Sequence, residues 1–156
     1  MTNQKQLLIV VHAPSPNTEK LRDAVVAGAR HPDIDTVEVA VKAPQDTTPD
    51  DVLACDALIL GTTENLGYMA GLTKDFFDRC YYPCLEHTQG LPFALYIRAG
   101  HDGTGTLRAI ESIATGLRWK MVQEPLICRG EYQQVFEQQC KELGLYMAAG
   151  LDAGVI

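Results

Sequence analysis

The segment QLLIVVHAPSPNTEKLRDAVVAGAR, residues 6–30, indicates which class of fold this chain adopts. Its apolar run has the length and composition of a buried strand over Gln6 to Val11, and it ends abruptly in the polar turn HAPSPNT. After this turn, Leu21 and Val25 lie on one face of a helix predicted over Asn17 to Arg30. A strand, a short polar turn and an amphipathic helix form the repeating unit of α/β folds.

The same alternation continues along the chain. Four further strands are predicted over Thr36 to Val41, Ala57 to Leu60, Leu91 to Ile97 and Met121 to Cys128, the last interrupted by Pro125. Asp50 to Cys55 is predicted to be a short helix, capped by Thr48 or Asp50. Three longer helices are marked by apolar residues at helical spacing, namely Leu72, Phe76, Cys80 and Cys84; Leu107, Ile110, Ala114 and Leu117; and Tyr132, Val135, Phe136, Leu143 and Met147. We therefore expect five strands alternating with five helices, in a mainly parallel sheet covered on both faces.

Length and composition indicate one ordinary domain, residues 1–156, because 46% of the residues are hydrophobic and a second core of normal size would not fit. The formal charge of −7 argues against nucleic acid and anionic membrane surfaces as partners, since both attract basic proteins. The N-terminal residues lack the long apolar stretch of a signal peptide or a membrane span. We expect a cytoplasmic protein.

Five cysteines lie in apolar stretches, which is typical of buried free thiols in a reducing compartment. Cys80, Cys84 and His87 share the spacing of one helix face and could offer three metal ligands. The sequence has no C-x-x-C pair and no obvious fourth ligand, and Pro83 interrupts the helix. Packing in a core or an interface is therefore the favoured interpretation, and no metal site is predicted.

Polar or glycine-rich loops follow the first, third and fourth strands, at His12 to Thr18, Gly61 to Gly71 and Ala99 to Gly105. Ligands of parallel α/β sheets bind at the carboxyl ends of the strands. We therefore expect these three loops to meet at one edge of the sheet and to form the functional site.

The first of these loops has the chemistry of either an anion site or a helix cap. Ser15, Asn17 and Thr18 offer hydroxyl and amide donors at a helix N-terminus, where phosphate binds readily. Pro14 and Pro16 supply no N–H group. A side chain of Ser15 or Asn17 that merely caps the helix explains the same residues, so both interpretations stay open at this point.

Two segments resemble those of flavodoxin-like FMN proteins. HAPSPNTEKLRDAV, residues 12–25, is similar to their phosphate-binding turn, with Pro16 where glycine is usual and Ala13 where a second hydroxyl is common. DALILGTTENLGYMAGLTKDFFDR, residues 56–79, is similar to the segment around the third strand of NAD(P)H-dependent FMN reductases and flavodoxin-like NAD(P)H:quinone oxidoreductases, with Thr63 in place of the usual proline. The residues in register there are Gly61, Thr62, Gly67, Met69, Gly71, Lys74, Phe76, Asp78 and Arg79.

This resemblance implies a flavodoxin-like three-layer sandwich with a five-stranded parallel sheet of order 2-1-3-4-5. It also implies an FMN cofactor, with its phosphate at the first loop and its ring between the second and third loops. Tyr68 and His101 are the side chains most able to contact the ring or a quinone, although ordinary loop packing also explains them. The cofactor-binding residues implied are Ser15, Pro16, Asn17, Thr18, Thr62, Thr63, Glu64, Asn65, Leu66, Gly67, Tyr68, Ala99, Gly100, His101, Asp102 and Gly103.

The function that the resemblance implies is reduction of a flavin, a quinone or a similar aromatic acceptor, with NAD(P)H as the reductant. The first turn has no G-x-G-x-x-G and the chain has no G-x-S-x-G, so a Rossmann dinucleotide site and a hydrolase are not indicated. A flavodoxin-type electron carrier and a flavin-free scaffold on the same fold are the alternatives. The helix with Phe76, Phe77, Tyr81 and Tyr82 is apolar around much of its circumference, so a homodimer also stays open.

Overall fold

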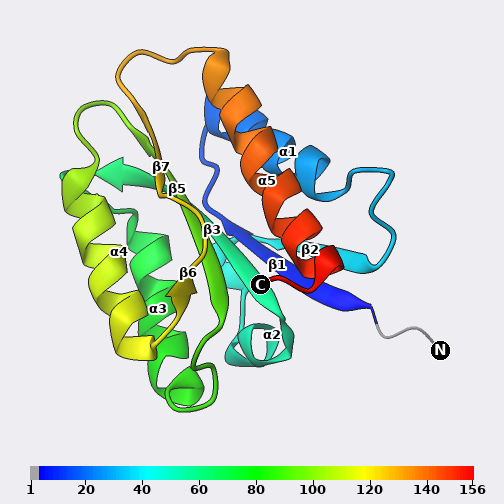
Figure 1. The fold of residues 1–156 in the computed structure, drawn as a ribbon. Helices are drawn as coiled ribbons and strands as arrows, with labels where there is room; N and C mark the ends of the chain where they lie inside the picture. The colour runs from blue at the N-terminus through cyan, green and yellow to red at the C-terminus, as the bar shows by residue number, and fades with distance from the viewer. Residues whose placement is uncertain (1–3) are drawn as a thin grey trace.

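A mainly parallel β-sheet lies between two layers of helices in the computed structural model, which describes residues 4–156 (Figure 1). The spatial order of the sheet is β2-β1-β3-β5-β6, with β7 also paired to β5. If β6 and β7 are counted as one interrupted strand, this order matches the expected 2-1-3-4-5. The strands are β1 (Lys5–Val11), β2 (Val37–Lys42), β3 (Ala57–Asn65), β4 (Tyr68–Met69), β5 (Pro92–Ala99), β6 (Lys120–Met121) and β7 (Leu126–Arg129).

The expectation of five strands was wrong in number, since the sheet has seven within residues 4–156. The predicted strand from Met121 to Cys128 is two short strands, β6 and β7, which pair with opposite ends of β5. Pro125 lies between them, and proline cannot donate a hydrogen bond to a sheet. The other additional strand is β4, which pairs with β3 in an antiparallel hairpin.

The predicted loop from Gly61 to Gly71 is largely this β3–β4 hairpin, residues 57–69, so the loop prediction was wrong. Strand β3 continues past Leu60 because β5 is long enough to pair with it as far as Thr63. The chain then turns at Leu66 and Gly67, both in the left-handed region with φ of 54° and 77°. Two successive left-handed residues are what a tight two-residue hairpin turn requires.

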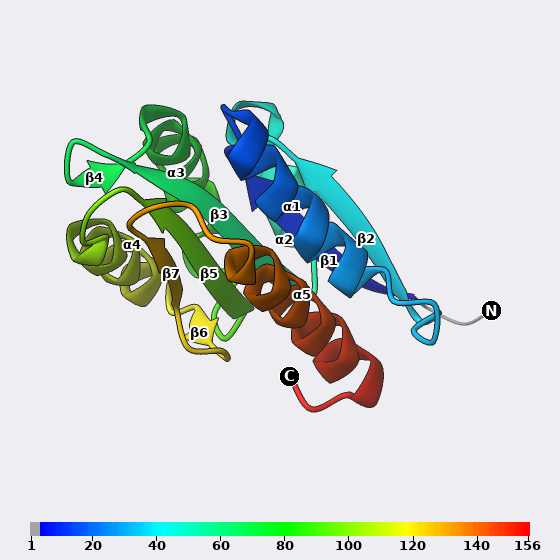
Figure 2. The same ribbon diagram turned by 90° about the horizontal axis from the view of Figure 1, so that it is seen from above.

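Helices α1 and α5 cover one face of the sheet, and α2, α3 and α4 cover the other (Figures 1 and 2). Tyr132 precedes α5 instead of lying in it as predicted, whereas Leu72 lies in α3 as predicted and is 40% exposed. Among residues 4–156, no helix is long and apolar enough to cross a membrane. The helices are α1 (Pro16–Ala29), the 3-10 helix η1 (Pro44–Asp46), α2 (Pro49–Ala54), α3 (Gly71–Cys84), α4 (Thr104–Leu117) and α5 (Val135–Ala153).

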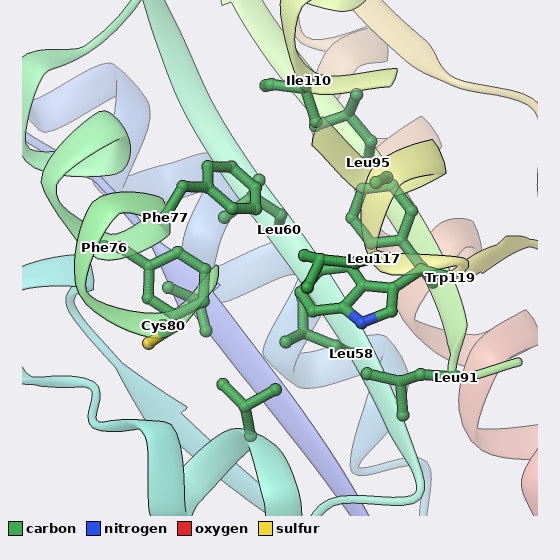
Figure 3. Close-up of a cluster of buried hydrophobic side chains, with 14 of the residues drawn as sticks. Leu58, Leu60, Phe76, Phe77, Cys80, Leu91, Leu95, Ile110, Leu117 and Trp119 are labelled. Atoms are coloured by element: carbon green, nitrogen blue, oxygen red, sulfur yellow. The ribbon is translucent and has the colours of Figure 1, made fainter. Parts of the chain in front are cut away.

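Alternation along the central strands produces two hydrophobic clusters, one on each face of the sheet. Leu7 and Ile9 of β1 point toward α1 and α5, whereas Leu8 points to the opposite face. Figure 3 shows that opposite cluster, where Phe77 of α3 and Trp119 after α4 close over the sheet, with their ring centroids 6.2 Å apart. Complete burial of a large apolar side chain stabilises a fold by roughly 1.5–3 kcal/mol.

Two glycines let the backbones of α1 and α5 touch. A Cβ atom added at Gly28 would lie 1.9 Å from the carbonyl oxygen of Lys141, and one added at Gly144 would lie 2.1 Å from that of Val25. Backbone atoms cannot move aside as a flexible side chain can. Both helices can therefore cover the same sheet face only because these two positions lack side chains.

We predict that Gly144→Ala destabilises the protein by about 1–3 kcal/mol, because the added methyl group separates α1 from α5. Urea unfolding followed by circular dichroism measures the change. Gly71→Ala is the control, since among residues 4–156 the Cβ that it would add has no atom within 4 Å apart from its chain neighbours and the backbone of α3. Equal stability of Gly144→Ala and the wild type would contradict the close contact.

Candidate functional site

The carboxyl end of β1 lies beside β3, and the carboxyl end of β5 lies on the other side of β3, at one edge of the sheet. Gly61 of β3 pairs with Val11 of β1 on one side and with Tyr96 of β5 on the other. The first loop is tied to β3 by the backbone N–H of His12, which donates to the carbonyl oxygen of Gly61 at 3.0 Å. This is the edge of the sheet at which α/β proteins bind ligands.

The first loop forms a capping box at the start of α1. Ser15 is the N-cap residue, and its Oγ accepts a hydrogen bond from the backbone N–H of Thr18 at 3.3 Å. In return, Thr18 Oγ1 accepts from the backbone N–H of Ser15 and donates to its carbonyl oxygen, both at 2.9 Å. Ser15, not Asn17, therefore caps the helix.

A cavity of about 420 Å³, which was not predicted from the sequence, opens between the first loop and the end of β2. His12, Arg22 and Lys42 are among the residues that line it. Lys42 Nζ is bonded to both carboxylate oxygens of Asp51 at 3.0 Å, and Arg22 Nε lies 3.1 Å from the carboxylate of Asp23. Since both cations already have acidic partners, the cavity has no strong preference for an anion.

The hairpin orients its threonines differently. The hydroxyl of Thr62 is buried and lies 2.9 Å from that of Thr73 on α3, so it faces the interior. Thr63 is partly exposed, and its hydroxyl donates to Asn65 Oδ1 at 2.9 Å. At the tip, Leu66 is fully exposed and Tyr68 is 41% exposed, which leaves both side chains accessible to a ligand.

The third segment, residues 99–103, has an exposed middle and buried ends. Gly100, His101 and Asp102 are exposed, whereas Ala99 and Gly103 are buried. Gly103 is the N-cap residue of α4 with φ of 78°, and a Cβ atom there would lie 2.6 Å from the Cγ2 atom of Ile127. The position therefore requires glycine on both conformational and steric grounds.

Glu64 connects the hairpin to this third segment. Its Oε1 accepts a hydrogen bond from the backbone N–H of Gly103 at 3.2 Å, and its Oε2 accepts one from Thr106 Oγ1 at 3.1 Å. Glu64 and Gly103 are both among the residues predicted for this site, whereas Thr106, which lies in the first turn of α4 and is fully buried, was not predicted.

Arg98 fixes the base of the third segment and was also missed. Its guanidinium donates to the carbonyl oxygens of Ala99 and Cys128 at 2.8 and 3.0 Å. It also lies over two aromatic rings, 5.8 Å from the centroid of Tyr132 and 5.5 Å from that of Phe136. A single cation in the apolar strand PFALYIRA was the signal that could have identified it.

Gly61 has a packing role that competes with a direct role in ligand binding. A Cβ atom at Gly61 would lie 2.3 Å from Cζ of Tyr96, whose ring crosses β3 at this point. The Tyr96 hydroxyl is buried and has no hydrogen-bond partner within residues 4–156. Burial raises the pKa of Tyr96 well above its ordinary value, so the ring stays neutral.

The cysteines considered as metal ligands are buried in packing positions. Cys80 and Cys84 belong to the core cluster under α3, whereas His87 is exposed beyond the end of that helix. Burial raises the pKa of Cys80 to about 12, which keeps the thiol protonated at neutral pH. Within the described residues, no group of three or more His, Cys, Asp and Glu side chains is placed to hold a metal ion.

Comparison with known proteins agrees with this architecture. No family model matches the chain. The chain is 30% identical over 112 residues to a flavodoxin of Aquifex aeolicus (strain VF5), a match that covers 72% of this chain but only 60% of the length of that flavodoxin. It superposes on a flavodoxin from the domain Archaea with a TM-score of 0.78 and 20% identity, over 94% of this chain and 98% of the other. The fold is flavodoxin-like.

A second solved structure extends this likeness. The flavodoxin, WrbA-like protein from Agrobacterium tumefaciens matches with a TM-score of 0.72 and 15% identity, over 97% of this chain and 98% of that one. The flavodoxin-like fold class predicted from the sequence is therefore confirmed. The narrower resemblance to NAD(P)H-dependent FMN reductases stays a prediction.

We predict that His12 titrates below its ordinary pKa of 6.5, because partial burial disfavours the charged imidazolium. The unfolded chain then binds more protons than the folded chain just below pH 6.5, so stability decreases as the pH falls through this value. Proton NMR measures the titration, with the His12 resonance identified by its loss in His12→Gln. A midpoint at or above 6.5 would contradict the prediction.

Proposed function

We propose that this chain binds FMN and catalyses NAD(P)H-dependent reduction of a flavin, a quinone or a similar aromatic acceptor. The observation that carries the proposal is the set of donors from Ser15 and Asn17 at the N-terminus of α1, with Ser15 held by Thr18, beside the carboxyl end of β1 on a flavodoxin-like fold. The identity with a named flavodoxin supports the FMN-binding part of the proposal.

The residues of the first loop fit a phosphate group. Thr18 Oγ1 donates its proton to the carbonyl oxygen of Ser15, and Ser15 Oγ accepts the N–H of Thr18. The Ser15 hydroxyl proton can therefore turn from Thr18 Oγ1 toward a phosphate oxygen without breaking the cap. Asn17 adds a side-chain amide and a backbone N–H in the first turn, where the helix dipole favours negative charge.

The hairpin residues 63–68 and the segment 99–103 are the proposed neighbours of the flavin ring. Tyr68 and His101 have exposed side chains, so either can contact the ring or the acceptor. Bound FMN would supply the hydride and electron transfer, while the protein would supply binding and orientation. This division of roles suits a site without an obvious protein nucleophile.

A flavodoxin-type electron carrier is the second candidate. The relative with 30% identity is named a flavodoxin, which favours a carrier over an enzyme. The two functions differ in the reductant, because a carrier exchanges electrons with protein partners and does not need to bind a nicotinamide. A flavin-free scaffold is the third candidate. It is the function expected if the Ser15–Thr18 pair serves only as a helix cap.

We predict that the purified protein, or the protein reconstituted with FMN, quenches flavin fluorescence at micromolar concentration. Ser15→Ala should weaken FMN binding by about tenfold or more, because a hydrogen bond to a charged phosphate oxygen is lost. Thr18→Ala should also weaken it, because Thr18 holds Ser15 in place through the capping box. Riboflavin lacks the phosphate, so its affinity should stay unchanged.

Thr48→Ala is the matched control for this pair, because Thr48 and Asp51 form the same kind of capping box on α2. It should lose about 1 kcal/mol of stability, as the Ser15 variant does, without any effect on FMN. Absence of FMN binding by the wild type would support the flavin-free scaffold. Equal losses for FMN and riboflavin would contradict a phosphate site at the first loop.

We predict that NADH or NADPH bleaches the flavin absorbance of the FMN-loaded protein rapidly in stopped-flow measurements. A nicotinamide has to reach the ring for hydride transfer, and the exposed hairpin tip at Leu66 and Tyr68 leaves an approach open. Chemical reduction by dithionite is the control that the bound flavin is accessible to a reductant. Slow bleaching by both nicotinamides with fast bleaching by dithionite would instead indicate the electron carrier.

A further inference from the structure

Helix α4 receives its N-terminal cap from a distant part of the chain. Helices α1 and α2 begin with their own capping boxes, at Ser15 and Thr48. In α4, all of whose residues are described, the N-cap residue Gly103 has no side chain and the first turn has no acidic residue. The Glu64 carboxylate, 39 positions earlier in the chain, accepts the Gly103 N–H instead.

This contact is favourable both as a hydrogen bond and as an interaction with the helix dipole. The N-terminus of a helix has unpaired N–H groups and a partial positive charge, so a carboxylate stabilises it. The second carboxylate oxygen accepts from Thr106 Oγ1, which is fully buried in the same turn. Both oxygens of Glu64 are therefore directed at α4.

A steric contact holds the hairpin against the same turn. A Cβ atom at Gly105 would lie 2.5 Å from the carbonyl oxygen of Gly67, so the tip of the hairpin rests directly on α4. The hairpin is thus fixed at two places, at Glu64 by hydrogen bonds and at Gly67 by close packing. These two contacts determine the distance between the β3–β4 hairpin and residues 99–103, which lead into α4.

We propose that Glu64 is a positioning residue that sets the separation between the β3–β4 hairpin and residues 99–103, and so the width of the site for a planar ring. The inference rests on the proposed function, in which these two segments flank the flavin. Glu64 acts through Gly103 and Thr106 and is not assigned a role in the chemistry. The positive end of α4 also offsets part of its negative charge.

The contact itself is tested without flavin by amide hydrogen exchange. Glu64→Ala should raise the exchange rate of the Gly103 amide by about tenfold, because the acceptor of a charge-assisted hydrogen bond is removed. Glu64→Gln retains an oxygen acceptor and should stay close to the wild type. Thr106→Val removes only the hydroxyl that donates to Glu64, and so tests the contact from the side of α4. Thr106→Ser retains a hydroxyl and should retain this hydrogen bond. Unchanged exchange at Gly103 in Glu64→Ala would overturn the proposal.

The role in ring binding is tested by titrating FMN and riboflavin separately. Glu64→Ala should weaken both ligands equally, by about tenfold, because the ring is common to both. This pattern differs from that of the Ser15 variant, which should affect FMN alone. Glu64→Gln should recover most of the affinity. Glu111→Ala, at an exposed position on α4, is the matched control and should bind both flavins as the wild type does.

The two proposals fail in distinguishable ways. If the wild type binds both flavins and Glu64→Ala binds them equally well, the positioning role is overturned while FMN binding stands. If Glu64→Ala weakens the binding of FMN but not of riboflavin, Glu64 acts on the phosphate and not on the ring. This outcome also overturns the positioning role. If the wild type binds neither flavin, both proposals are overturned, whatever the Gly103 exchange rate.

Discussion

The parallel pairing of β3 with β1 on one side and β5 on the other is the constraint on which the rest of the candidate site depends. The ladder aligns Gly61 with both Val11, where β1 ends, and Tyr96, whereas β3 and β5 continue together beyond this level as far as Thr63 and Arg98. The segments that follow β1, β3 and β5 can occupy only the space that the neighbouring strands do not fill. The room for the Tyr96 ring over Gly61 is one result of this constraint.

Helix capping in this protein is local at two helices and long-range at a third. Ser15 and Thr18 cap α1 from within four consecutive residues, and Thr48 and Asp51 do the same for α2. Helix α4 depends on Glu64, so its first turn is stabilised only when the hairpin is in position. The same contact therefore stabilises α4 and positions the hairpin of the site, whereas the cap of α2 stabilises only its own helix.

The sequence predicted the elements whose signal is periodic apolar residues, and it missed those that depend on a partner. Helix α1 and strand β1 follow closely the ranges expected from residues 6–30. The extension of β3 from Gly61 to Asn65 has no apolar alternation, and it forms because β5 and β4 supply hydrogen-bond partners. Leu66 is also an unusual residue in a left-handed turn, so a hairpin was not indicated there.

The sequence by itself determined the α/β alternation and the polar turn at Ser15 to Thr18. These features depend on residues close together in the chain, whose hydrogen bonds and helical or strand periodicity are fixed by local geometry. Only the tertiary structure decided that Glu64 faces α4, that Arg98 ties the third segment to β7, and that Gly61 makes room for Tyr96. Contacts of this kind join residues 30 or more positions apart, and they form only after the sheet has brought the strands together.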